Sequence, residues 1–96
     1  MQNDKIRKHL KITGRVQGVG YRYFTRKNAE ELNVNGWVKN MPDGSVETML
    51  SGHPKDVEEL IERLWKGPYT ARVKNIDLIE KGSTEKEELH NFYVKR

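Results

Sequence analysis

The spacing of apolar residues switches repeatedly between strand-like and helix-like along this chain of 96 residues, and that alternation constrains the fold more than any other feature. Ile6, Leu10 and Ile12 share one parity, which predicts a strand that leads into a glycine-rich loop. The spacing then becomes helical, so a first helix is expected over about residues 22–32. Asn33 follows at a position where a left-handed residue ends many helices.

A hairpin is expected next. Two short β-prone runs, at about residues 37–40 and 45–51, flank the sequence MPDG. Proline followed by Asp-Gly is typical of a tight turn, so the two runs are expected to pair.

A second helix and two more strands complete the expected elements. Pro54 stands where this helix should begin, and Gly67-Pro68 stands where it should end. Trp65 belongs to the apolar face of the helix, and we therefore expect its ring in the core. The last two strands are predicted at about residues 73–80 and 89–95.

The expected order is β-α-β-β-α-β-β, and it limits the architecture. Two helices cannot cover both faces of a sheet of four or five strands. The prediction is therefore an α+β fold in two layers, a ferredoxin-like split βαβ sandwich with an extra strand, in which both helices pack on one face of an antiparallel sheet. No linker or low-complexity stretch divides the chain, so residues 1–96 are expected to form a single domain.

Composition narrows the class of protein. The chain has no cysteine, which excludes disulfides, thiolate metal sites and cysteine nucleophiles. No stretch approaches the ~20 apolar residues of a membrane span, and the N-terminus lacks a signal-like apolar run, so a cytoplasmic protein without membrane association is expected. The formal net charge of +4 permits an acidic partner, but the basic residues are scattered among 14 acidic ones and never form a run of five or six, as on an ordinary solvated surface. The three histidines lie far apart without metal-ligand spacing, so no metal site is expected.

The loop at residues 14–22, with the sequence GRVQGVGYR, is the strongest candidate for a functional site. Gly18 and Gly20 carry no Cβ, so the backbone can turn tightly and direct several amide N–H groups toward one point. The positive end of the following helix favours an anion there, and the guanidinium of Arg22 offers two parallel hydrogen bonds to its oxygens. A bound phosphate group is the expected ligand.

Asn40, at the end of the first hairpin strand, is expected near this loop, where its carboxamide would orient a water molecule. In the alternative interpretation the loop has no ligand: the glycines only form a turn, Arg22 is solvated and Asn40 is an ordinary hairpin residue. The spacing of these residues alone favours this alternative. Arg15 and Gln17 either donate to a ligand or bond carbonyls of the loop itself. The loop matches neither GxxxxGK[ST] nor GxGxxG, which argues against nucleotide binding of those kinds.

Two separate stretches resemble the signatures of the acylphosphatase family. They are GRVQGVGYR and NGWVKNMPDGSVE (residues 35–47), and SGHPKDVEEL and NFYVKR extend the similarity over nearly the whole chain. The resemblance, with a length of 96 residues, implies a small free-standing acylphosphatase, although the family also occurs as a domain of a hydrogenase-maturation carbamoyltransferase. Tyr21 is the one departure noted, because phenylalanine is common there and the added hydroxyl needs water or a partner.

The resemblance implies an enzyme that hydrolyses the carboxyl–phosphate bond of small acyl phosphates, with neither metal nor cofactor. By motif, Arg22 would hold the phosphate and Asn40 would position the attacking water. A free phosphate or sulfate ion is expected to occupy the same site. The loop residues that would bind the phosphate are Arg15, Val16, Gln17, Gly18, Val19, Gly20 and Tyr21.

The alternative function is that of a binding module, a basic ferredoxin-like domain that contacts RNA or a protein partner without catalysis. RNA-binding sheets usually display aromatic stacking platforms, and only Trp37 and Tyr93 are candidates here, so nucleic-acid binding is not expected. The sequence shows no extra apolar stripe that needs a partner, so a monomer is expected, with an edge strand left as the one place where pairing is conceivable.

Overall fold

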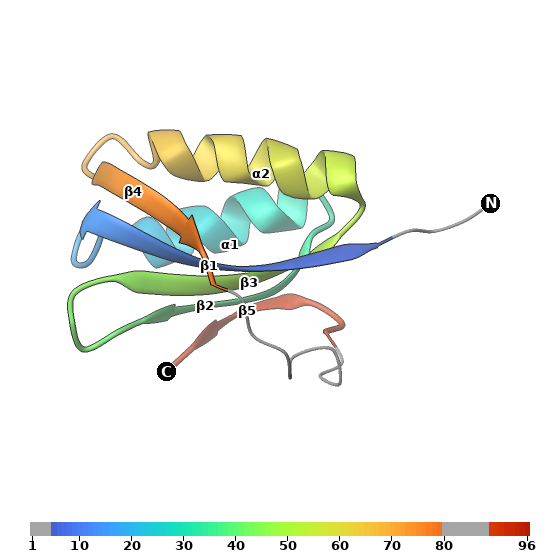
Figure 1. Cartoon of the computed structure of the whole chain (residues 1–96), viewed down its shortest axis with the longest axis horizontal. Helices are drawn as coiled ribbons and strands as arrows, with labels where there is room; N and C mark the ends of the chain where they lie inside the picture. Colours follow the sequence, from blue (N-terminus) through green and yellow to red (C-terminus); the bar gives the residue numbers. More distant parts are fainter. Residues whose placement is uncertain (1–4, 80–88) are drawn as a thin grey trace.

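The computed structural model describes residues 5–79 and 89–96, which form a sheet and two helices (Figure 1). Every expected element is present, and each begins and ends within a few residues of its expected position. The predicted end of the fourth strand at Glu80 lies outside the described residues, and the fifth strand begins at Phe92, three residues after the predicted Leu89. No described helix is long and apolar enough to cross a membrane. The elements are β1 (Ile6–Arg15), α1 (Tyr21–Glu31), β2 (Asn35–Asn40), β3 (Val46–Gly52), α2 (Pro54–Lys66), β4 (Arg72–Leu78) and β5 (Phe92–Lys95).

The sheet has five strands in the order β4-β1-β3-β2-β5. Three of its pairings are antiparallel, but β5 runs parallel to β2, so the expectation of a purely antiparallel sheet is corrected to a mixed one. The reason is the position of the last strand. β4 runs toward the end of the sheet where β2 begins, and β5 starts at that same end on the opposite edge, with Phe92 beside Gly36. A strand that enters there must run in the direction of β2.

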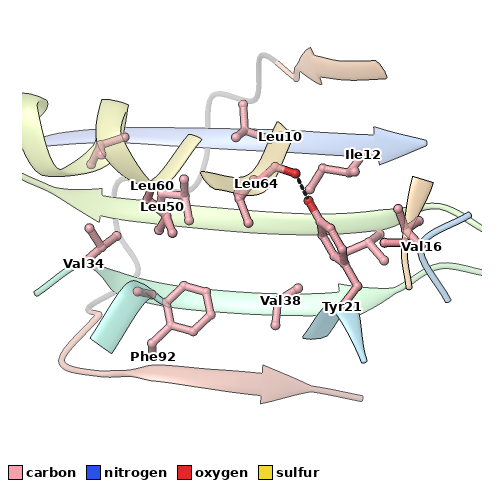
Figure 2. Close-up of a cluster of buried hydrophobic side chains, with 14 residues drawn as sticks. Leu10, Ile12, Val16, Tyr21, Val34, Val38, Leu50, Leu60, Leu64 and Phe92 are labelled. Atoms are coloured by element: carbon pink, nitrogen blue, oxygen red, sulfur yellow. Dashed lines mark hydrogen bonds between the residues drawn. The ribbon is translucent and has the colours of Figure 1, made fainter. Parts of the chain in front are cut away.

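Both helices lie on one face of the sheet, which confirms the two-layer sandwich. α1 packs against β2 and β5, while α2 packs against β3 and β4 (Figure 1). Strand residues of one parity face the helices, and their side chains form a single core with the apolar faces of both helices (Figure 2). The core residues labelled there include Leu10, Ile12, Val38, Leu50, Leu60, Leu64 and Phe92.

The second helix begins at Pro54 as expected and buries a narrow stripe of side chains. Val57, Leu60 and Leu64 are fully buried, whereas Trp65 is 45% exposed. The expectation that Trp65 lies in the core is therefore wrong. Successive residues of an α-helix are about 100° apart around its axis, so Trp65 lies well to the side of Leu64, at the rim of the buried stripe.

The turn between β2 and β3 folds as its sequence predicts. The amide of Gly44 donates to the carbonyl of Met41, and the amide of Met41 donates to the carbonyl of Ser45. The hydroxyl and amide of Ser45 both donate to Asp43, whose other carboxylate oxygen pairs with the ammonium of Lys11. These hydrogen bonds hold the pKa of Asp43 below its usual range. They fix the turn beside the loop that follows β1.

Candidate functional site

Three segments that are far apart in the sequence meet at one end of the sheet. β1 and β2 are both antiparallel to β3, and β5 is parallel to β2, so these strands all point the same way. Their C-terminal ends therefore lie together. The loop of residues 16–20 follows β1, Asn40 is the last residue of β2, and Arg96 follows β5 (Figure 1).

A cavity of about 340 Å³ opens where these segments meet. Arg22 and Asn40 both line it, so the two residues expected to act together are brought to one place. The remaining lining residues come from the loop, the first turns of α1 and the end of β5. They are Val16, Gly18, Gly20, Tyr21, Tyr23, Arg26, Val94 and Arg96.

The loop leaves a set of backbone donors without partners. Gly18 and Gly20 adopt positive φ angles of 75° and 80°, a conformation that side-chain-bearing residues rarely take. The loop then enters α1, whose first three amides have no acceptor within the helix. Among the described residues, no backbone carbonyl or side chain accepts a hydrogen bond from the N–H groups of residues 17–23. Such a cluster of free donors at a helix N-terminus favours an anion.

The electrostatics of the cavity also favour an anion. The first turn of α1 holds no acidic residue, and its N-cap Gly20 supplies no side-chain hydrogen bond, so the positive end of the helix is not compensated locally. Arg22, Arg26 and Arg96 all line the cavity, and none of them takes part in the ion pairs found among the described residues. Three arginines thus line the space, and none of them has a carboxylate partner in the part of the chain that is described.

Sequence reasoning missed Arg26 and Arg96, although a signal existed for each. Arg26 is four residues after Arg22 and therefore lies on the same face of α1. Arg96 follows Phe92 and Val94 with the alternation of a strand, and the β2–β5 register carried one step beyond Lys95 places it beside Asn40. The second signal needs the parallel pairing, which the sequence did not reveal.

Asn40 carries a buried oxygen that no described residue satisfies. The residue lies at the end of β2, opposite Val46, on the face of the sheet that the helices cover. Its Oδ1 is buried and has no hydrogen-bond partner within the described part of the chain. A buried acceptor left unsatisfied is unfavourable by about 1–3 kcal/mol, so the carboxamide of Asn40 has hydrogen-bonding capacity that the described residues do not use.

Gln17 does not line the cavity. Its side-chain amide donates to the carbonyls of Met41 and Ser45, each at 2.9 Å. The carbonyls that Gln17 bonds belong to the β2–β3 turn and not, as in one of the two expected alternatives, to its own loop. The side chain therefore connects the loop to the turn that follows Asn40.

Arg15 and Val19 also lie outside the cavity. They line an adjoining hollow with Gly18, which is common to both spaces. The carbonyl of Val19 accepts a hydrogen bond of 2.7 Å from the hydroxyl of Thr70, which fixes the far side of the loop. Of the loop residues expected to bind phosphate, Val16, Gly18, Gly20 and Tyr21 line the cavity itself.

The hydroxyl of Tyr21 has a protein partner. It donates to the backbone carbonyl of Leu64 at 2.7 Å, at the C-terminal end of α2 (Figure 2). That carbonyl would normally accept from the amide four residues later, but the residue there is Pro68, which has no N–H. Tyr21 thus supplies the donor that proline lacks. Burial raises the pKa of this phenol above its ordinary value.

Metal-ligand side chains do not gather anywhere in the described parts of the chain. Within residues 5–79 and 89–96, no group of three or more His, Asp or Glu residues is placed to hold a metal ion.

The fold and the site together define a small α+β sandwich protein with a loop of free amide donors at the end of its first strand. The family model described as Acylphosphatase matches residues 8–94, and the chain belongs to the acylphosphatase family. An acylphosphatase of Thermococcus kodakarensis is 47% identical over 74 residues, which is 77% of this chain and 81% of that protein.

Two solved structures share the fold. The crystal structure of acylphosphatase from Bacillus subtilis has a TM-score of 0.85 at 33% identity and covers 94% of this chain and 98% of its own. The structure of an acylphosphatase from Coxiella burnetii also has a TM-score of 0.85, at 38% identity. The match covers 96% of this chain and 94% of that one. Membership of the family and the shared fold support hydrolysis of acyl phosphates.

Proposed function

We propose that this chain hydrolyses small acyl phosphates, with Arg22 and the loop amides holding the phosphate group while Asn40 positions the attacking water. The observation that carries the proposal is the common cavity, which is lined by Arg22, by Asn40 and by loop residues whose amides have no described partner. Because the side chains of Arg15, Gln17 and Val19 lie elsewhere, the loop is proposed to contribute through its backbone.

The proposed reaction is a displacement at phosphorus. The oxygen of a water molecule held by Asn40 forms a bond to phosphorus, and the bond from phosphorus to the carboxylate oxygen breaks. One proton of the water passes to a phosphate oxygen of the substrate, and the carboxylate leaves with the bonding electron pair. A carboxylate is a good leaving group, so positioning and charge neutralisation can provide the catalysis without a protein nucleophile.

The proposal includes independence from metals and cofactors. Charge on the transferring phosphoryl group is commonly neutralised by Mg²⁺ or by arginine and backbone N–H groups. Here Arg22, Arg26 and Arg96 line the cavity, together with the free amides of the loop. These groups are of the kind that can take over the charge-neutralising role of a metal ion. The cytoplasmic location and the monomeric state stay predictions.

The test is the hydrolysis of acetyl phosphate by the wild-type chain and by two variants. In excess EDTA the wild type is expected to release acetate and inorganic phosphate. Arg22→Ala and Asn40→Ala are each expected to lower kcat/KM by about 100- to 1,000-fold, the effect of removing one transition-state donor. Phosphate release measured in a coupled assay, with folding checked by circular dichroism, decides the result.

Two matched control variants show whether a loss of activity is specific to the cavity or follows from removing any cation or any carboxamide. Lys27→Ala removes an exposed cation from α1 outside the cavity, and Asn35→Ala removes the same carboxamide from the other end of β2. Both controls should keep wild-type activity. Undiminished turnover in Arg22→Ala or Asn40→Ala would refute the roles assigned to them, and a requirement for added metal would refute the metal-free reaction.

The surroundings of Trp37 weigh against the RNA-binding alternative. This ring lies on the face of the sheet that the helices leave open, but it is only 6% exposed. His9 contacts it edge-on at 5.4 Å between ring centroids, and the ammonium of Lys95 lies 4.4 Å from its centroid. A ring already packed in this way offers no free surface on which a base can stack.

A further inference from the structure

The hollow next to the phosphate cavity gathers positive charge that nothing in the described structure neutralises. It has a volume of about 700 Å³. Arg15 and Arg72 are direct cross-strand neighbours in the β1–β4 pairing, and both are exposed. Neither takes part in an ion pair with another described residue. The hollow is lined by Arg15, Gly18, Val19, Tyr69, Thr70 and Arg72.

Two like charges directly opposite each other on neighbouring strands are unfavourable, and an anion held between them removes that repulsion. The two guanidinium groups also present planar donor sets that match a carboxylate or a phosphate. The pair is therefore suited to bind an anionic group from solution.

Hydrogen bonds hold the backbone segments on two sides of the hollow. The turn that follows α2 is closed by the amide of Ala71, which donates to the carbonyl of Pro68 at 2.9 Å. The hydroxyl of Thr70 bonds the carbonyl of Val19 at 2.7 Å and ties this turn to the loop after β1. Arg72 follows directly as the first residue of β4. The hollow and the phosphate cavity thus have a fixed relation to each other.

Gly18 separates the two spaces without blocking the way between them. It lines both the cavity and the hollow. A Cβ built at this position would meet no heavy atom within 4 Å, so the space above the residue is open. A ligand whose phosphate lies against Arg22 can therefore extend over Gly18 toward Arg15 and Arg72.

From this arrangement we propose that the hollow is a second anion subsite, in which Arg15 and Arg72 bind a negatively charged group at the far end of the acyl chain. The inference rests on the proposed function and adds the preferred class of substrate to it. Acyl phosphates with a terminal carboxylate or phosphate ester are then bound better than those of equal length with an uncharged end.

The test compares two substrates that have the same number of carbon atoms. Succinyl phosphate ends in a carboxylate, and butyryl phosphate ends in a methyl group. The measured quantity is the ratio of kcat/KM for succinyl phosphate to that for butyryl phosphate. We expect the wild-type ratio to exceed one and Arg72→Gln to lower it about two- to fivefold, the effect of losing one solvent-exposed ion pair. Arg72→Glu should lower the ratio further, and about 0.5 M KCl should reduce the wild-type ratio toward one.

Lys74→Gln is the matched control, because it removes an exposed cation from the same strand two residues away and outside the hollow. It should leave the ratio unchanged. Two results would overturn the inference: an unchanged kcat/KM ratio in Arg72→Gln, or an equal loss of the ratio in Lys74→Gln. Failure of the wild type to hydrolyse either substrate would instead contradict the proposed function itself.

Discussion

At the scale of single residues, the phenol of Tyr21 links the functional loop to the end of the second helix. The sequence showed a hydroxyl that needed a partner, and the structure supplies the carbonyl of Leu64, which Pro68 leaves without a backbone donor. The same residue begins α1 and lines the cavity beside Arg22. Its hydroxyl therefore contributes to stability, while its position contributes to the site.

Replacement of this hydroxyl gives a stability prediction. Tyr21→Phe keeps the ring but leaves the buried carbonyl of Leu64 without a donor, so the free energy of unfolding should fall by about 1–2 kcal/mol near neutral pH. Urea denaturation followed by circular dichroism measures the difference. Equal stability of the two proteins would show that the hydrogen bond to Leu64 contributes nothing.

The pH dependence of the same variant is a second prediction. Burial raises the pKa of Tyr21 in the folded state above the ordinary value of 10.0. Above pH 10 the unfolded chain therefore releases this proton while the folded chain retains it, and stability falls as the pH rises, by up to ~1.4 kcal/mol per pH unit. Tyr21→Phe lacks this dependence, so the advantage of the wild type should be complete at about pH 8 and smaller at about pH 11. An advantage that grows with pH would contradict the prediction.

Site residues could be predicted from the sequence where they stand in a local motif. Arg22 and Asn40 were found because each belongs to a distinctive string, and the structure places both at one cavity. Arg96 reaches the cavity because β5 pairs with β2, which is distant in the sequence. Arg72 lines the hollow beside Arg15 because β4 pairs with β1. The partners of Gln17 likewise lie across the β2–β3 turn. Contacts of this kind have no local signal.

At the scale of elements, the sequence predicted which segments form strands and helices better than how they pack. The turn at Pro42, the helix beginning at Pro54 and the left-handed Asn33 at φ 59° are as expected, because proline, glycine and asparagine restrict or relax the backbone locally. The direction of β5 and the exposure of Trp65 differ from expectation. Both depend on which element lies alongside, and periodicity carries no information about that.

The close approach of β2 and β3 gives a prediction for this scale. Gly36 has a φ of +143°, and a Cβ there would collide with the backbone carbonyl of Met49 on β3. Backbone atoms in the middle of a sheet cannot move aside without breaking the pairing. Gly36→Ala should therefore lower the free energy of unfolding by more than ~3 kcal/mol or prevent folding.

Gly44→Ala is the control for Gly36→Ala, because it adds backbone strain without a collision. Gly44 also has a positive φ, +94°, but a Cβ at this position in the turn meets nothing within 4 Å. Gly44→Ala should reduce the free energy of unfolding by only about 1–2 kcal/mol. Thermal or urea unfolding measures both variants, and a similar loss in the two would show that the collision with Met49 is relieved in some other way.

At the scale of the whole molecule, positive charge is concentrated where the C-terminal ends of β1, β2 and β5 meet. The formal net charge is only +4, yet three arginines line the cavity and two more line the neighbouring hollow.

At the two edges of the sheet, β4 carries Arg72, Lys74 and Asp77 on exposed positions, and β5 has only four residues. Charged and short edge strands discourage pairing with another copy, in keeping with the predicted monomer.

Binding of inorganic phosphate should stabilise the whole fold. An ion that binds only the folded state, present at ten times its Kd, adds about 1.4 kcal/mol, which corresponds to a rise in Tm of roughly 6–11 °C for a domain of this size. Differential scanning fluorimetry with increasing phosphate, at constant ionic strength, measures the shift. The shift should be lost in Arg22→Ala and kept in Lys27→Ala. A shift of equal size in Arg22→Ala would contradict binding at this site.

The two side-chain bonds that hold the loop, from Gln17 to the β2–β3 turn and from Thr70 to Val19, have a consequence for affinity. A free loop of glycines would lose conformational entropy each time a ligand ordered it. Here that loss is incurred once, when the protein folds, so an arriving anion meets a loop whose backbone is already held in place. Gln17→Ala and Thr70→Ala should therefore each weaken the binding of inorganic phosphate, although neither side chain lines the cavity beside Arg22.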